Sequence, residues 1–147
     1  YKDGNEIVDA RMQCFQNSLM KRGLYKSEYT KFGDYYAKYG YELLKELHKE
    51  GNMPTALFVA NDSMAAGSYR AAYELGLPIP DDIIGFNDIP TAKYMVPPLT
   101  TERLYMEFMG EYAVKLLEER IVFGREICVR VTIPTKLYVR DSVKNLK

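Results

Sequence analysis

The sequence has few of the residues that metal sites and hydrolytic active sites require. It contains one histidine, His48, and two cysteines, Cys14 and Cys128, which lie far apart and show no metal-ligand spacing. Two isolated cysteines indicate free thiols in a reducing compartment. His48 falls near the end of a predicted helix, where a solvated side chain interacting with the helix dipole is the simplest role. We therefore predict no metal site.

An excess of charge of one sign is also missing. Lysine and arginine number 20, aspartate and glutamate number 20, and the formal net charge is zero. A domain that binds nucleic acid by itself usually carries a positive excess, because phosphate neutralisation supplies most of its non-specific affinity. No apolar run approaches the roughly 20 residues that span a bilayer, and no secretory signal opens the sequence. We expect these residues neither to bind DNA directly nor to enter a membrane.

Catalytic constellations are absent from the sequence as well. Gly33 and Gly85 are isolated, so neither Walker nor dinucleotide-binding spacing occurs, and no serine stands in a nucleophile-elbow context. The adjacent pairs Asp81–Asp82 and Glu118–Glu119 would diverge on a helix, and we interpret them as surface charge. The sequence predicts a protein that is not an enzyme, with no catalytic residues and no cofactor.

What is present is an alternation of amphipathic and compact apolar segments in 147 residues, a length that fits one domain. Apolar periodicity and glycine stops predict helices over 6–22, 37–49, 62–75 and 106–122. Short strands are predicted over 29–32, 55–60, 83–86, 127–133 and 136–139, and a loop containing Pro90, Pro97 and Pro98 leads to residues 99–101. Strands alternating with helices of this length indicate an α/β fold with a parallel sheet flanked by helices.

Polar residues follow three of the predicted strands. Tyr35 comes after the first, Asn61 and Asp62 after the run TALFVA, and Asn87 and Asp88 after IIGF. In an open parallel sheet, ligands bind beyond the carboxyl ends of the strands. If the three strands are neighbours, Tyr35, Asn61 and Asn87 face one crevice. Two amides and an aromatic ring suit a neutral ligand rich in hydroxyl groups.

Each of these residues also has a purely structural interpretation. Asn61 or Asp62 can cap the helix that follows. Asn87 and Asp88 can simply form a turn, because both residue types favour turns. Tyr35 is one of 13 tyrosines, and most tyrosines serve packing. The binding hypothesis depends on the conjunction of the three positions, not on any one of them.

Several long segments resemble one known family. PTALFVANDSMAAGSYRAAYELGLPIPDD, IIGFNDIP, PPLTT and IPTKLYVRDS, in this order, are similar to the core of lactose/galactose repressor family regulators. The resemblance implies a periplasmic-binding-protein-like fold of type I, with two α/β lobes joined by three crossover strands around a small effector. It assigns residues 1–103 and 135–147 to the C-terminal lobe and 104–134 to the N-terminal lobe. The fold would then be incomplete, with the DNA-binding domain absent from this chain.

The resemblance also implies roles for particular residues. Arg11 in ARMQCF falls where the family places an arginine that hydrogen-bonds the effector, and Tyr35 falls at the stacking aromatic position. Asn61 matches the residue that binds effector hydroxyls. Asn87 stands where aspartate is typical, so the pocket would prefer another hydroxyl geometry or bind more weakly. Asp62 and Asp88 would hold the neighbouring Asn61 and Asn87 in position without contacting the effector.

The implied function is that of the sugar-binding part of a cytoplasmic bacterial regulator, a repressor of a sugar-utilisation operon. Sugar binding would be coupled to affinity for operator DNA, which a homodimer would read through an upstream helix-turn-helix. The GDYYAKYGY region favours galactose or a galactoside as the effector. The alternative is a sugar-binding protein of a transport system, which shares the fold, and the upstream sequence would separate the two.

Overall fold

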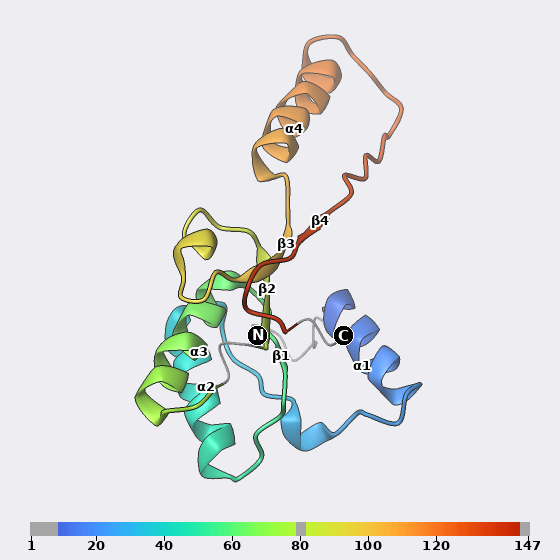
Figure 1. Ribbon diagram of the computed structural model, residues 1–147. Coiled ribbons are helices and arrows are strands. Elements are labelled where there is room, and N and C mark those ends of the chain that lie inside the picture. Colours follow the sequence, from blue (N-terminus) through green and yellow to red (C-terminus); the bar gives the residue numbers. More distant parts are fainter. Residues whose placement is uncertain (1–8, 79–81, 145–147) are drawn as a thin grey trace. The chain divides into compact units, whose positions relative to one another are not determined.

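The computed structural model describes residues 9–78 and 82–144, which belong to two compact units, residues 1–31 and 32–147 (Figure 1). The first unit contains α1 (Ala10–Met20) and the 3-10 helix η1 (Ser27–Tyr29). Asp9 caps α1, because its carboxylate accepts a hydrogen bond from the backbone N–H of Arg11 at 2.9 Å. The helix predicted over 6–22 is confirmed from Ala10 to Met20, while residues 6–8 lie outside the described residues.

The second unit combines a four-stranded sheet with three α-helices. Its strands are β1 (Leu57–Phe58), β2 (Ile83–Asn87), β3 (Thr100–Arg103) and β4 (Lys136–Tyr138), in the order β1-β2-β3-β4. Its helices are α2 (Ala37–Lys49), α3 (Asp62–Leu75) and α4 (Met106–Ile121), with a 3-10 turn η3 (Ala92–Tyr94). β1, β2 and β3 run parallel, and β4 pairs antiparallel with β3. The predicted α/β class and the parallel core of the sheet are confirmed.

Local signals predicted the helices of this unit well. The bounds of α2 and α3 are those predicted, and α4 ends one residue early. Asn61 caps α3, and Gly76 ends it in the left-handed conformation at φ 63°, where glycine avoids the Cβ clash of other residues.

Two predicted strands are wrong. Residues 27–29 form η1, and 30–32 are irregular. Residues 127–133 contain no assigned strand either. Both segments have strand-like composition, but a strand also needs a hydrogen-bonding neighbour, and the segments pair with none of the described strands. The predicted runs 55–60, 83–86 and 136–139 are confirmed as β1, β2 and β4, with bounds shifted by up to two residues at each end, whereas β3 follows the predicted proline-containing loop and was not predicted as a strand.

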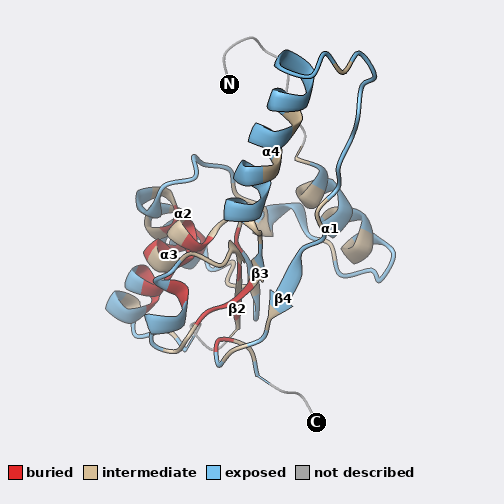
Figure 2. Cartoon of the chain, turned by 90° about the horizontal axis from the view of Figure 1, so that it is seen from above, coloured by how far each residue is buried: buried red, intermediate tan, exposed pale blue. Residues whose placement is uncertain are grey.

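The core of the second unit lies between the sheet and the pair α2 and α3, as the buried residues in Figure 2 show. Ile83 on β2 and Leu99 beside β3 are completely buried, and burial of each such side chain stabilises the fold by about 1.5–3 kcal/mol. The two helices pack through glycines. A Cβ on Gly40 would lie 1.9 Å from the carbonyl oxygen of Met64, and one on Gly67 would lie 1.8 Å from that of Ala37. This close packing fixes where both helices begin.

Helix α4 contrasts with that core, because none of its residues is buried (Figure 2). Its exposed apolar side chains include Phe108, Leu117 and Ile121, and Ile121 is 77% exposed. β3 leads into α4, and residues 122–135 return from it to β4 (Figure 1). Among the described helices, none is long and apolar enough to cross a membrane.

Candidate functional site

Tyr35 and Asn61 lie together where α2 and α3 begin. The side-chain amide of Asn61 donates a hydrogen bond from Nδ2 to the carbonyl oxygen of Tyr35 at 2.9 Å. Its Oδ1 accepts one from the backbone N–H of Met64 at 2.8 Å, which is the N-cap interaction. The Tyr35 ring stays in solvent, with the residue 56% exposed. The Asn61 amide is thereby fixed in direction, and one donor hydrogen and one acceptor lone pair remain for a ligand.

Asp62 is a fully buried carboxylate at the first turn of α3. Its Oδ1 accepts a hydrogen bond from the Thr101 hydroxyl at 2.6 Å, and its Oδ2 accepts one from the backbone N–H of Ile89 at 2.8 Å. Gly85 makes room for it, since a Cβ there would lie 2.2 Å from Oδ1. Burial raises the pKa of the Asp62 carboxyl, because desolvation disfavours its charged form more than these donors stabilise it. Asp62 therefore joins α3 to the turn after β2 and to β3.

Asn87 and Asp88 form a turn with an unusual backbone. Both have positive φ, 110° at Asn87 and 56° at Asp88, a region that residues other than glycine rarely adopt and in which asparagine and aspartate are the most frequent. Asn87 ends β2, so it lies at the same edge of the sheet as Asn61, because β1 and β2 are parallel neighbours. The turn leaves the Asn87 side chain partly exposed.

Asp88 points away from solvent toward two arginines. Its side chain is 9% exposed, and its Oδ1 accepts a hydrogen bond from Arg140 Nη2 at 2.7 Å. Arg103 Nη1 is 3.9 Å from Oδ2. Arg103 also lies over the rings of Tyr105 and Tyr138, at 5.5 Å from each centroid. The Asp88 carboxylate is thus neutralised by groups on β3 and just after β4.

Arg11 belongs to the first unit, where it pairs with Asp9. Its Nη2 lies 2.5 Å from Asp9 Oδ2, and its Nε donates to both carboxylate oxygens at 3.1 Å. The hydrogen bond from the Arg11 guanidinium lowers the pKa of the Asp9 carboxyl, because its effect is larger than the opposing effect of burial. A sugar contact by Arg11 stays a prediction, and its guanidinium is already oriented by a carboxylate.

The second unit therefore brings together Tyr35, Asn61 and the Asn87 turn, but through contacts other than the three neighbouring strand ends that were predicted. Tyr35 does not follow a strand, yet the Asn61 amide holds its backbone. Asp62 connects Asn61 to the Asn87 turn through Ile89 and Thr101. Sequence reasoning missed Arg103 and Arg140, because nothing in local spacing relates residue 140 to residue 88. The motif IPTKLYVRDS was the only signal that could have pointed to Arg140.

The side chains at this edge of the sheet are polar and aromatic. They offer amide donors and acceptors and an exposed aromatic ring, which suits hydroxyl groups and an apolar sugar face. The described residues contain no group of three or more histidine, cysteine or acidic side chains able to hold a metal ion.

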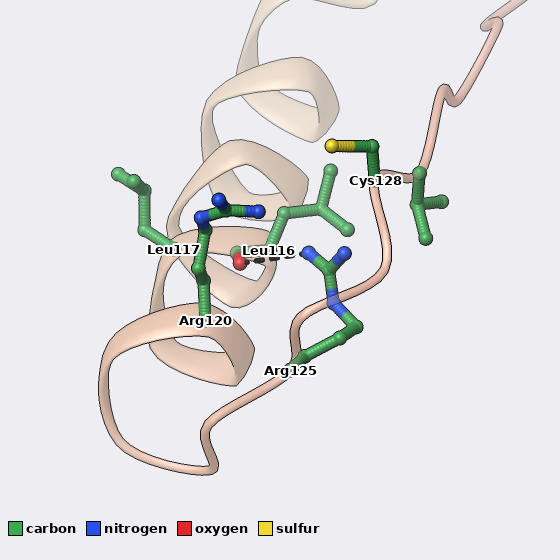
Figure 3. A pocket seen from close by; sticks show the side chains of 6 residues that line it. Leu116, Leu117, Arg120, Arg125 and Cys128 are labelled. Carbon is green, nitrogen blue, oxygen red and sulfur yellow. Dashed lines mark hydrogen bonds between the residues drawn. The ribbon is translucent and has the colours of Figure 1, made fainter.

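A separate hollow of about 230 Å³ lies between α4 and the segment that follows it (Figure 3). Its lining comprises Leu116, Leu117, Arg120, Arg125, Cys128 and Val129. Arg125 donates from Nη2 to the carbonyl oxygen of Leu116 at 3.2 Å and pairs with Glu119 at 2.9 Å, so it closes the end of α4. The hollow shares no residue with the site around Asn61 and the Asn87 turn, and we assign no ligand to it.

Comparisons with known proteins identify the family. A family model for a periplasmic binding protein-like domain matches residues 1–143. The HTH-type transcriptional regulator GalR of Streptococcus thermophilus is 39% identical over 97% of this chain and 44% of its own length. The lactose operon repressor of Rhizobium radiobacter is 48% identical over 71% of this chain and 94% of that protein. The chain thus spans less than half the length of the Streptococcus regulator.

A solved structure agrees with the sequence comparisons. The LacI family transcriptional regulator of Enterococcus faecium, determined with bound ribose, superposes with a TM-score of 0.82 at 29% identity, over 93% of this chain and 52% of that one. These relatives are transcriptional regulators, in agreement with the prediction that the chain is not an enzyme. The chain belongs to the periplasmic-binding-protein-like family that provides the effector-binding domain of lactose/galactose-repressor-type transcriptional regulators.

Proposed function

We propose that this chain is the sugar-binding part of a cytoplasmic transcriptional repressor, with Arg11, Tyr35, Asn61 and Asn87 as the ligand-contacting residues. Asp62 and Asp88 support them without touching the sugar. Galactose or a galactoside is the proposed effector, because the GDYYAKYGY region resembles regulators of this kind and one relative is a lactose operon repressor. Operator DNA is bound by a homodimer through a helix-turn-helix outside residues 1–147.

One observation carries the proposal. Asn61 and the Asn87 turn lie at the carboxyl edge of parallel neighbours β1 and β2, and Asn61 holds Tyr35 beside it. Such an edge is where open α/β sheets bind ligands. An oriented amide with free hydrogen-bonding capacity, next to an exposed ring, matches a neutral polyol better than a charged or purely apolar ligand.

The lobe assignment follows from the same family. We propose that residues 1–103 and 135–147 form the C-terminal lobe and that 104–134 belongs to the N-terminal lobe. The absence of buried residues in α4 supports this, because a helix with Phe108, Leu117 and Ile121 exposed needs another apolar surface to cover.

Regulation then follows from differential affinity. A sugar that contacts both lobes favours one lobe orientation, and it alters DNA affinity only as far as it binds one orientation more tightly. Coupling energies of about 1–3 kcal/mol are typical of allosteric proteins and would suffice for a response.

The first test is a thermal-shift screen of the intact gene product against D-galactose, lactose, D-glucose and D-ribose. We expect D-galactose or lactose to raise the melting temperature more than D-glucose and D-ribose do, because a ligand at about 100 times its Kd stabilises the native state by about 2.7 kcal/mol. The absence of any shift at millimolar sugar would reject the proposed function.

The second test is Asn61→Ser with calorimetry of the sugar found in the screen. Serine retains the N-cap acceptor, since it ranks with asparagine at this position, but it lacks the amide donors. We expect the sugar to bind about 1–3 kcal/mol more weakly, because its hydroxyl loses a partner in the pocket. Asn52→Ser, after the other end of α2, is the control and should leave affinity unchanged. Equal affinities of both variants would remove Asn61 from the site.

A further inference from the structure

The turn at Asn87 and Asp88 is held in place by hydrogen bonds to Asp62 and to Thr101. The backbone N–H of Ile89 donates to Asp62, and that of Asp88 lies 3.4 Å from the Thr101 hydroxyl. Positive φ at a residue with a side chain costs about 1–2 kcal/mol, so the turn keeps its shape only through such contacts. The conformation that presents the Asn87 side chain therefore depends on α3 and on β3.

Arg140, the partner of Asp88, is itself fixed to β3. Its Nη1 donates to the carbonyl oxygen of Leu99 at 2.7 Å. Its backbone N–H donates to the Thr100 hydroxyl at 2.8 Å, and that hydroxyl donates back to the Arg140 carbonyl oxygen at 3.0 Å. The Arg140 side chain is only 17% exposed. Asp88 is thus connected through Arg140 to the segment after β4 and to the start of β3.

These two strands are the connections between the sheet and α4. β3 ends at Arg103 and leads into α4, while β4 begins at Lys136 and receives the returning chain (Figure 1). Arg103 is opposite Asn87 in the β2–β3 register and opposite Lys136 in the β3–β4 register. The Asp88 carboxylate is thus the charged group that links the turn to both connections.

We propose that Asp88 is a positioning residue that couples occupancy of the Asn87 turn to the two strands that lead to and from α4. This inference rests on the proposed function, because the turn must first be occupied by a sugar. When the sugar moves or rigidifies Asn87, the buried pair with Arg140 carries the change to β3 and β4. Without the Asp88 carboxylate, the sugar still contacts Asn61 and Tyr35, but its binding no longer alters β3 and β4.

The test is hydrogen exchange of the intact gene product with and without the sugar selected above, at equal saturation of each variant. In the wild type we expect the sugar to change exchange in 83–89 and also in 99–105 and 135–141. In Asp88→Asn the change in the two strand segments should fall about 2- to 30-fold, the range by which residues along a coupling route alter coupling. Asp82→Asn is the matched control, since Asp82 precedes the other end of β2 and pairs with exposed Lys144 at 3.7 Å.

The outcomes separate the two ideas. A wild-type-sized response of the strands in Asp88→Asn would overturn the coupling role, as would a wild type that responds only in 83–89. A wild type with no sugar-dependent exchange anywhere would overturn the proposed function, and the coupling role with it. A purely structural Asp88 would lower the melting temperature without uncoupling the strands from the turn. If Asp88→Asn does not fold, Arg140→Gln tests the same pair from the arginine side, and an undiminished response of the two strand segments there also overturns the coupling.

Discussion

Alanine at Gly67 tests the close packing on which the positions of Tyr35 and Asn61 depend. The new Cβ would lie 1.8 Å from the Ala37 carbonyl oxygen and 2.9 Å from the Tyr41 nitrogen. Ordinary contacts of a Cβ lie beyond 3.4 Å, so α2 and α3 must separate by more than an ångström. The obstructing atoms are backbone atoms of a helix and cannot rotate away.

The magnitude follows from two opposing effects. Overpacking a core costs typically about 1–3 kcal/mol, occasionally more, and a backbone obstruction belongs at the upper end. Alanine gains about 1 kcal/mol over glycine in a helix interior. We expect a net loss of about 2 kcal/mol in the free energy of unfolding. At about 2–4 °C per kcal/mol for proteins of this size, the melting temperature should fall by roughly 4–8 °C.

Gly110→Ala is the matched control, because Gly110 is inside α4 and a Cβ there meets nothing within 4 Å. It should raise the free energy of unfolding by about 0.5–1 kcal/mol. Calorimetric melting or urea unfolding of both variants gives the comparison. If Gly67→Ala were as stable as Gly110→Ala, the close approach of α2 and α3, and the placement of Tyr35 beside Asn61, would be wrong.

Two further predictions concern buried polar groups. Ser142→Ala should lower the free energy of unfolding by about 1–3 kcal/mol, because the fully buried Ser142 hydroxyl donates to the Ile83 carbonyl at 2.6 Å and accepts from the Thr100 N–H at 2.7 Å. Urea unfolding against Ser27→Ala, an exposed change expected to stay within about 0.5 kcal/mol, measures it, and equal losses would contradict it. For Asp62, burial raises the pKa, so the folded state holds the proton more tightly than the unfolded state, and stability falls as pH rises from the ordinary value of 3.8 through the raised pKa. The difference in unfolding free energy between Asp62→Asn and the wild type should therefore move in favour of the variant across that window, and a difference that does not depend on pH would refute the raised pKa.

The helices could be predicted from the sequence because their signals are local. Asn61 at the start of α3, Gly76 at its end and the apolar spacing of α2 act within a few residues. Strands depend on partners, and this is why 29–32 and 127–133 were predicted wrongly: apolar and β-branched composition describes a surface that fits a sheet, not a neighbour that is present.

The site shows the same division. Asn61, Asp62, Asn87 and Asp88 were found because they directly follow the runs that become β1 and β2. Arg140 and Thr101 reach the turn only because β3 and β4 fold beside β2, and no spacing along the chain encodes that. The family resemblance supplied roles for the first set and none for the second.

The antiparallel pairing of β4 with β3 gives the stretch between them the status of an insertion. Since Arg103 and Lys136 are paired neighbours, the chain leaves the sheet and re-enters it at one point, which a two-residue hairpin turn could close without loss of a ladder hydrogen bond. Changes in the length or composition of 104–135 therefore leave the register of the sheet intact.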